Sequence, residues 1–320
     1  MPEPLLEVKN IQVEYRSKDR VVKAVRGVNL RINKREIIGI VGESGCGKST
    51  LAMTFLKLVD IPGKITSGEI IYHGKTDIDV LKLKPSALRK YRWKEVSMIF
   101  QGSMNALNPV TRIEEQIMDT MIEHGYEQET AMKRVDELLR IAGLNPSVKR
   151  SFPHELSGGM KQRVNIAISL ACEPSLVIAD EATTALDVVV QRQIMARLLK
   201  LRDELGISLV FITHDISLVA NIADRVYVMY AGKIVENGPV KEIFHNPKHP
   251  YTIALLNSIP SINRDKKIKG IPGTPPDLSK PINGCPFAPR CSKAFDKCHE
   301  IEPDLISIGQ DHEVSCHLYG

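Results

Sequence analysis

Residues 42–49, GESGCGKS, have the types and the spacing of a loop that binds phosphate groups. They fit the pattern G-x-x-x-x-G-K-[ST] in full, between an apolar run that predicts a strand and a segment that predicts a helix. Glycines let such a backbone turn so that several N–H groups point at phosphate oxygens, and the helix adds its positive N-terminal end. We expect Lys48 to reach the β- and γ-phosphates of a nucleotide, Ser49 to ligate Mg²⁺, and Cys46 to be a small residue that fits. The residues of this segment predicted to bind the nucleotide are Gly42, Ser44, Gly45, Cys46, Gly47, Lys48, Ser49 and Thr50.

Two adjacent acids are the second candidate for chemistry. Asp180 and Glu181 follow the apolar residues 176–179, LVIA, so they stand at the end of a predicted strand. In nucleotide-hydrolysing proteins with a phosphate loop, an Asp at this point holds Mg²⁺, directly or through water. A neighbouring acid can accept a proton from the attacking water or orient it. We therefore assign Asp180 to Mg²⁺ and Glu181 to water, against the alternative of a solvated acid pair, which a strand end alone would also fit.

The segments around these residues predict the α/β core that must position them. Residues 37–41, 176–180 and 208–213 are short apolar runs typical of buried strands, and the helical pattern of 189–205 separates the last two. A strand–helix–strand order of this kind favours a parallel sheet. Alternating apolar and polar residues predict β-structure in the first 35 residues, and the pattern turns helical between about 105 and 172.

The composition is that of an ordinary globular protein. The chain has 320 residues, of which 43% are hydrophobic and 25% charged, and its net charge is +5. Lys and Arg form no long block, which argues against nucleic-acid binding. No apolar run approaches the roughly 20 residues of a spanning helix, and the N-terminus has no secretory signal. We expect the chain to stay in the cytoplasm, so that any membrane-spanning part of its assembly belongs to another protein.

A third motif, Leu156–Met160 (LSGGM), lies between the phosphate loop and the acid pair. The order of the three motifs resembles the ATP-binding cassette (ABC) family, and the resemblance covers residues 6 to about 246. It implies an α/β, ABC-type P-loop NTPase fold with a RecA-like core, an antiparallel β subdomain and a helical subdomain at about 103–172, all within a nucleotide-binding domain of residues 1–246. The chain has Met160 where the family usually has Gln, a variant familiar among peptide-transport ATPases.

The resemblance implies roles for residues that are ordinary by themselves. Tyr15 corresponds to the aromatic side chain that stacks on adenine, and His214 to the switch histidine that contacts the γ-phosphate. Gln101 corresponds to the glutamine that touches Mg²⁺ or water and senses the membrane subunit. Alone they would be an edge aromatic, a turn histidine and a polar loop residue. The implied catalytic set is Lys48, Gln101, Glu181 and His214, and the implied Mg²⁺ ligands are Ser49, Gln101 and Asp180.

The resemblance also implies an assembly. In the family, Ser157, Gly158 and Gly159 serve the ATP of the opposite subunit, and Asp187 of the D-loop crosses between subunits. Two chains then sandwich two ATP molecules, and the second ATPase is either another copy or a paralogue. Two transmembrane permeases and an extracytoplasmic peptide-binding protein complete the transporter, with this chain peripheral at the cytoplasmic face of the membrane. A non-transport ABC ATPase and a module that binds ATP without hydrolysing it are the rival interpretations.

Residues 247–320 are rich in proline and resemble the C-terminal extension of oligopeptide/dipeptide transporter ATPases. The matching pieces are PYT at 250–252, GIPG at 270–273, GCPF at 284–287 and PRC at 289–291. The resemblance implies import of dipeptides or oligopeptides, with nickel import as the alternative because nickel importers share the architecture. We expect a small, loop-rich unit whose own core is too small for stability without a staple.

Four of the six cysteines lie in this extension, with the spacing C-x5-C-x6-C-x17-C. Four thiolates can hold a 4Fe–4S cluster or zinc, and free thiols or a disulfide are further alternatives. Zinc sites favour C-x2–4-C pairs, which this chain lacks. Members of the resembled family carry a 4Fe–4S cluster in this region, so the resemblance implies such a cluster in a structural role, with zinc as the alternative. Its ligands would be Cys285, Cys291, Cys298 and Cys316.

Overall fold

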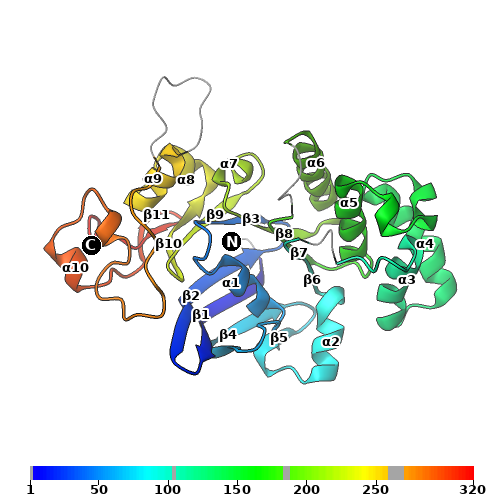
Figure 1. The fold of residues 1–320 in the computed structure, drawn as a ribbon, viewed down its shortest axis with the longest axis horizontal. Helices are drawn as coiled ribbons and strands as arrows, with labels where there is room; N and C mark the ends of the chain where they lie inside the picture. The colour runs from blue at the N-terminus through cyan, green and yellow to red at the C-terminus, as the bar shows by residue number, and fades with distance from the viewer. Residues whose placement is uncertain (1–2, 103–105, 183–187, 259–269) are drawn as a thin grey trace.

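The computed structural model describes residues 3–320 apart from 103–105, 183–187 and 259–269. The described residues are organised around an eight-stranded sheet with the order β11-β12-β10-β9-β3-β8-β7-β6 (Figure 1). From β9 to β6 the neighbouring strands are parallel, whereas β10, β12 and β11 extend the sheet in antiparallel pairs. The bounds are β3 Ile37–Val41, β6 Val96–Ile99, β7 Leu176–Asp180, β8 Ser208–Thr213, β9 Arg225–Tyr230, β10 Lys233–Pro239, β11 Ile306–Gly309 and β12 His312–Val314.

The strand β3 shows that this sheet is buried on both faces. All five of its residues are buried. Ile38 and Ile40 belong to a cluster shared with the N-terminal strands, whereas Ile37 and Val41 belong to the cluster on the opposite face. Successive side chains of a strand point to opposite faces, so a strand covered on both sides is apolar throughout. The predicted α/β core with a parallel sheet is confirmed.

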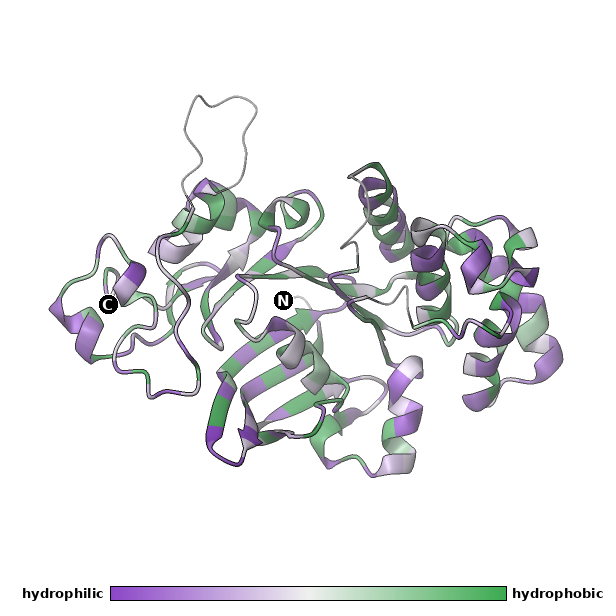
Figure 2. Ribbon diagram, viewed as in Figure 1, coloured by the Kyte–Doolittle hydropathy of each residue, from purple (hydrophilic) through white to green (hydrophobic). Residues whose placement is uncertain are grey.

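A second, antiparallel sheet and the helix α1 cover one face of the large sheet. Its strands have the order β2-β1-β4-β5. Leu6, Ile11 and Ile32 of these strands form one buried cluster with Leu51 and Phe55 of α1. Figure 2 shows hydrophobic and hydrophilic residues alternating along the strands, as expected for a sheet with one face on the core. The bounds are β1 Pro4–Ser17, β2 Arg20–Asn33, α1 Lys48–Phe55, β4 Gly63–His73, β5 Asp77–Asp79, the 3-10 helix η1 Val80–Lys82 and α2 Pro85–Lys94.

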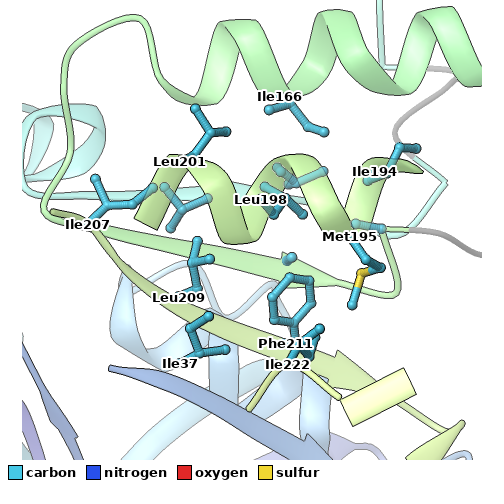
Figure 3. Packing of buried hydrophobic residues seen from close by; sticks show 14 of the residues in the cluster. Ile37, Ile166, Ile194, Met195, Leu198, Leu201, Ile207, Leu209, Phe211 and Ile222 are labelled. Carbon is cyan, nitrogen blue, oxygen red and sulfur yellow. The ribbon is translucent and has the colours of Figure 1, made fainter. Parts of the chain in front are cut away.

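Helices cover the other face and form a group beyond β6. Leu198 and Leu201 of α6 lie over Ile37 and Leu209 of the sheet, and Ile166 of α5 packs on the same helix (Figure 3). Figure 1 shows α3, α4 and α5 together at the end of the molecule opposite the C-terminus. Among the described residues, every helix is too short or too polar to cross a bilayer. The bounds are α3 Ile113–Glu123, α4 Gln128–Ile141, η3 Pro146–Arg150, η4 Pro153–Glu155, α5 Gly158–Ser169, α6 Val188–Leu205 and α7 Ile216–Val219.

The C-terminal extension is loop-rich but joins the large sheet. Its strand β12 pairs with β10, where Val314 lies opposite Glu236, and β11 pairs with β12. Tyr251 and Phe287 of the extension belong to the main buried cluster. The extension therefore shares the core of the cassette, which the composition of the segment alone did not indicate. Helix α8, Val240–His245, precedes the extension, whose own helices are α9 Pro250–Asn257, η5 Ala288–Arg290 and α10 Asp296–Glu300.

A buried carboxylate ties the extension to β10. Glu236 has no exposed surface. It accepts hydrogen bonds from the backbone N–H groups of Lys248 (2.7 Å) and His249 (3.0 Å), and one of its oxygens lies 2.9 Å from His312 Nε2. A buried charge is tolerated when it is paired and hydrogen-bonded in this way. These contacts hold residues from both ends of the extension against one strand.

Candidate nucleotide site

The predicted phosphate loop connects β3 to α1 and is pressed against neighbouring backbone at two glycines. Gly42 has φ 153° and Gly47, the N-cap of α1, has φ 102°. A Cβ atom on Gly42 would lie 2.1 Å from the carbonyl oxygen of Met229, and one on Gly47 would lie 2.3 Å from that of Ala24. Both positions therefore require glycine, and they fix the path of the loop against β9 and β2.

Lys48 is buried at the start of α1, with its ammonium group against the loop. Its Nζ donates hydrogen bonds to the carbonyl oxygens of Gly42 (2.8 Å) and Glu43 (3.0 Å). Cys46 is also buried, and burial raises the pKa of its thiol. Cys46 is thus a neutral packing residue, whereas the Lys48 cation and the N-terminus of α1 lie on the same loop, as phosphate binding requires.

Ser49 and Asp180 come together from α1 and from the end of β7. Ser49 Oγ donates a hydrogen bond to a carboxylate oxygen of Asp180 at 3.1 Å. Burial raises the pKa of Asp180, and the nearby Glu181 charge acts in the same direction, whereas the bond from Ser49 lowers it. Oxygen ligands are those that Mg²⁺ prefers, so this hydroxyl and carboxylate fit the predicted ion.

The carboxylate of Glu181 is held between two side chains. Gln101 Nε2 donates a hydrogen bond to one oxygen at 2.8 Å, and His214 Nδ1 lies 3.0 Å from the other. The three residues follow β6, β7 and β8, which are neighbours in the sheet. Because the carboxyl ends of parallel strands meet at one edge, side chains far apart in sequence converge there, as ligand sites of α/β sheets do.

The backbone of Glu181 is in an unusual conformation. Its φ of 46° lies in the left-handed region, which residues other than glycine rarely adopt. Its N–H donates a hydrogen bond to the carbonyl oxygen of Ile212 in β8 at 2.9 Å. Conformations of this kind persist where the surroundings impose them, and they cluster at functional sites. The backbone and the two side-chain contacts together set the direction of the Glu181 carboxylate.

The LSGG-type motif begins a different helix. Ser157 is the exposed N-cap of α5, and its hydroxyl accepts a hydrogen bond from the Met160 N–H at 3.3 Å. Gly158 and Gly159 form the first turn, and a Cβ atom on Gly159 would lie 2.8 Å from Val190 of α6. The N–H groups at the start of α5 therefore belong to the helical group and not to the phosphate loop.

The remaining predicted residues are dispersed. Ser44 and Gly45 are exposed on the phosphate loop, and Thr50 is half-buried in α1. Tyr15 is half-buried in β1, with its ring beside Gly63 of β4. Asp187 lies outside the described residues.

The sequence alone indicated no role for Glu43 of the phosphate loop or for the two residues that contact it, Tyr251 and Arg290. The N–H of Glu43 donates a hydrogen bond to the Tyr251 hydroxyl at 2.8 Å. The Glu43 carboxylate accepts two hydrogen bonds from the Arg290 guanidinium, at 2.6 and 2.8 Å. Tyr251 and Arg290 both stand in pieces by which the extension is recognised, PYT and PRC. Those pieces are the signal that could have directed attention to them.

The predicted iron–sulfur cluster, with zinc as its alternative, is wrong. In the part of the chain that the structure describes, no three His, Cys, Asp or Glu side chains are arranged to hold a metal ion. The four cysteines of the extension are free thiols. They line one cavity of about 20 Å³, the space of about one water molecule. These cysteines are Cys285, Cys291, Cys298 and Cys316.

Burial sets the protonation of these thiols. Burial raises the pKa of Cys285 to about 11, and it also raises the pKa values of Cys291 and Cys316. The thiolate, not the thiol, is the metal ligand. Beside the buried Phe287 and Ala288, the thiols of Cys285, Cys291 and Cys316 are neutral, whereas the evidence against a ligand set is the arrangement of the described side chains. Sequence spacing brought the cysteines into one region, but it did not determine their protonation or their geometry.

Comparison with known proteins agrees with the geometry. The family model described as ABC transporter matches residues 25–184, and the model for the oligopeptide/dipeptide transporter C-terminal region matches residues 235–298. The oligopeptide transport ATP-binding protein of Bacillus subtilis is 45% identical, over 98% of this chain and 88% of that protein. The dipeptide transport ATP-binding protein of Caldanaerobacter subterraneus is 41% identical, over 98% of this chain and 97% of that protein.

Solved cassette structures share the fold. A dimeric ATP-binding cassette in a post-hydrolysis state, bound to ADP and Pi, has a TM-score of 0.65 at 31% identity, covering 73% of this chain and 98% of that one. A component of an ABC transporter complex from Clostridium perfringens has a TM-score of 0.66 at 31% identity, covering 76% and 92% of the two chains. This chain belongs to the ABC transporter family, as an ATP-binding cassette that carries the C-terminal region of oligopeptide/dipeptide transporters.

Proposed function

We propose that this chain is the ATP-binding and ATP-hydrolysing subunit of a membrane transporter that imports dipeptides or oligopeptides. The observation that carries the proposal is the Glu181 carboxylate held between Gln101 and His214, next to the Ser49–Asp180 pair. This is the arrangement that hydrolysis of a nucleotide needs beside a phosphate loop. Peptides are the proposed cargo because relatives at 41% and 45% identity are dipeptide and oligopeptide transport proteins.

The phosphate loop supplies binding. Lys48 and the N–H groups between Gly42 and Ser49 would bind the β- and γ-phosphates of ATP. Ser49 and Asp180 would hold Mg²⁺, with Gln101 beside them. When bound, the ion would neutralise negative charge on the phosphate oxygens. Tyr15 is the proposed stacking partner for adenine.

Glu181 supplies the polarisation of water. Its carboxylate accepts a hydrogen bond from the attacking water and can take its proton, a role that contributes about 10²–10⁴-fold in rate. Gln101 and His214 fix the orientation of that carboxylate through one oxygen each. The His214 side chain is 57% exposed, so it remains accessible to the γ-phosphate. Both partners therefore position the base, and His214 also completes the phosphate site.

A second ATPase chain completes each site in this proposal. The exposed N-terminus of α5, with Ser157–Gly159, would bind the phosphates of ATP held by the opposite chain, and Asp187 would cross between the two. Support comes from the dimeric cassette structures to which this chain is similar. Two permease subunits would form the membrane path, an extracytoplasmic protein would deliver peptide, and this chain would lie at the cytoplasmic face of the membrane.

The substitution Glu181→Gln tests the proposal because the amide keeps the size of the side chain but cannot accept the proton. We expect retained Mg–ATP binding, more stable ATP-bound dimers, and a fall in kcat of about 100-fold or more. Cells that carry only this variant should lose uptake of a radiolabelled dipeptide.

The matched control is Glu129→Gln, an exposed position on α4 whose carboxylate pairs with Lys133. It should leave turnover and uptake unchanged. Unaltered turnover in Glu181→Gln would show that Glu181 is not the base. Normal uptake of dipeptides and oligopeptides in cells that lack the chain would rule out peptide import.

A further inference from the structure

Two side chains of the C-terminal extension reach the phosphate loop and contact the same residue, Glu43. Glu43 is the second residue of the loop. Its carbonyl oxygen accepts a hydrogen bond from Lys48 Nζ at 3.0 Å. Its N–H donates to the Tyr251 hydroxyl at 2.8 Å, and its carboxylate accepts from both terminal nitrogens of Arg290 at 2.6 and 2.8 Å. Backbone and side chain of Glu43 are therefore both bound by the extension.

Arg290 is held in place by contacts that do not involve Glu43. Its side chain is 4% exposed. Nε donates a hydrogen bond to the carbonyl oxygen of Pro272 at 2.7 Å, and a terminal nitrogen donates to the Tyr230 hydroxyl at 3.1 Å. The guanidinium carbon lies 5.8 Å from the centre of the Tyr230 ring and 5.9 Å from that of Phe287. These contacts leave the planar group one orientation, the one that forms a two-bond pair with a carboxylate.

Tyr251 is equally constrained. It is fully buried in α9, and its ring lies 4.6 Å from that of Tyr230 and 5.4 Å from that of Phe287, measured between ring centres. Its hydroxyl therefore has a fixed position, where it accepts the N–H of Glu43. The extension thus presents one fixed acceptor and one fixed cation to the beginning of the phosphate loop.

The location of these contacts distinguishes them from the other ion pairs between extension and cassette. Glu302 of the extension pairs with Arg26 of β2 and, at 2.7 Å, with Lys233 of β10. That pairing joins the extension to strands and does not touch the phosphate loop. The Glu43 contacts act on the residue whose carbonyl oxygen binds the catalytic lysine, so a shift of Glu43 displaces the surroundings of Lys48 directly.

We propose that Arg290 and Tyr251 are positioning residues for the nucleotide site, through which the C-terminal extension holds the phosphate loop in the conformation that binds ATP. The inference rests on the proposed ATPase function. In this proposal the extension contributes to the affinity for ATP, in addition to packing into the core that it shares with the cassette. A preorganised loop pays no ordering cost when the phosphates arrive, so loss of the contacts should weaken binding more than it slows the bound complex.

The test compares Arg290→Lys, Glu43→Gln and the double variant with the wild-type full chain, using Mg–ATP titrations and steady-state ATPase assays. Lys keeps the charge of Arg290 but cannot form two parallel bonds. We expect each single variant to raise the Kd and KM for ATP about tenfold, the size expected for one charged hydrogen bond. The double variant should bind Mg–ATP no more weakly than the single variant with the lower affinity, because both changes remove the same contact. In all three, kcat should stay within about twofold of wild type.

Tyr251→Phe provides a second measurement from the backbone side. It keeps the ring in its aromatic cluster and removes only the acceptor for the Glu43 N–H. We expect faster hydrogen exchange at the Glu43 amide and a smaller rise in KM. Where Arg290→Lys fails to fold, Glu43→Gln tests the same contact from the loop, at a side chain that is 25% exposed.

The matched control is Glu302→Gln, which weakens a half-buried ion pairing between extension and cassette that lies away from the phosphate loop. It should leave the Kd for Mg–ATP unchanged. Unchanged Kd and KM in Glu43→Gln would overturn the inference. An equal loss of affinity in Glu302→Gln would also overturn it, because any contact that attaches the extension to the cassette would then have the same effect. A wild-type chain that binds no Mg–ATP would instead refute the proposed function, so the two failures are distinguishable.

Discussion

The edge of the sheet at Glu181 gathers polar side chains from distant parts of the sequence, whereas the cavity lined by four cysteines gathers thiols from residues 285–316, and the chemistry of the two regions differs. At the sheet edge, each polar group meets a partner, as in the Ser49–Asp180 contact and the two contacts of Glu181. In the cavity, the thiols lie among apolar groups such as Phe287, and burial raises the pKa of Cys285 to about 11. The first region holds charge ready for a ligand, whereas the second keeps its groups neutral.

The difference follows from the elements that carry the residues. Parallel strands end together at one edge, so the residues that follow β6, β7 and β8 converge by geometry. The cysteines are carried by loops and short turns, in which Cys285 N–H bonds to the Cys298 carbonyl oxygen at 2.8 Å. Such turns satisfy the backbone and bring the four thiols to one cavity, but no three of the described His, Cys, Asp or Glu side chains are arranged there to hold a metal ion.

The largest effect on kcat in this comparison is expected when His214 is removed from the cluster at the sheet edge. In His214→Ala, the Glu181 carboxylate loses its contact with His214 Nδ1, and we expect kcat to fall about 10–100-fold. Adding this change to Glu181→Gln should cost little more, because the two residues act as a unit. Steady-state ATPase assays of both single variants and the double variant measure this. Independent, multiplicative losses would contradict the assignment of His214 as a partner of Glu181.

A second effect concerns His249, which lines the cysteine cavity. Burial lowers the pKa of His249 to about 3. In the unfolded chain the ordinary value is about 6.5, so the unfolded state binds more protons between these values and stability falls as pH drops below about 6.5. One such group contributes up to about 1.4 kcal/mol per pH unit to the free energy of unfolding.

The matched variant is His249→Asn, which keeps a side-chain acceptor for the Tyr251 N–H at the start of α9. Denaturant unfolding at pH 7 and pH 5 should show a smaller loss of stability in the variant than in wild type. Equal pH dependence would indicate that His249 is not buried in neutral form.

A smaller effect concerns the thiols themselves. Because burial raises the pKa values of Cys285 and Cys316, both should react with iodoacetamide at pH 7.5 more slowly than in the unfolded chain. The single substitutions to Ser should change kcat less than about twofold, since neither side chain contacts the nucleotide site. Mass spectrometry of alkylated peptides and ATPase assays measure the two outcomes. Rapid alkylation of the folded chain would contradict the neutral, buried setting.

No effect is expected on removal of transition metals. Chelation followed by return of Mg²⁺ should leave the melting temperature and ATPase rate of the full chain unchanged, because the described cysteines form no ligand set. Chain isolated anaerobically should contain no stoichiometric iron, sulfide or zinc. Four iron atoms per chain with matching sulfide would contradict the account of the cavity and remove its contrast with the sheet edge.

The sequence predicted those parts of the fold and of the site in which the residues lie on, or directly after, regular strands and helices. The apolar runs at 37–41, 176–180 and 208–213 coincide with β3, β7 and β8, so the pattern of apolar residues was enough to place Asp180 and His214 at strand ends. The helix predicted over 189–205 is α6, which spans Val188–Leu205. In these segments a period of two or of 3.6 residues carries the structural information.

Contacts between distant irregular segments were not predictable. Glu43 and Arg290 are 247 positions apart, and each would be an ordinary charged residue in its own segment. The pairing of β12 with β10 likewise joins His312–Val314 to a strand far upstream, with no turn between them to signal it. The cysteine spacing misled for the same reason, because a count of intervening residues in a loop determines neither distance nor direction.

The most direct test of the central claim is a calorimetric titration of the full chain with ATP, with and without Mg²⁺, beside the variant Lys48→Ala. The account predicts saturable binding that requires Mg²⁺ in the wild type. In Lys48→Ala the affinity should fall at least about 100-fold, since the buried ammonium that we propose binds the phosphates is gone. Equal affinity in the two chains, or no Mg²⁺-dependent binding by the wild type even beside its companion subunits, would contradict it.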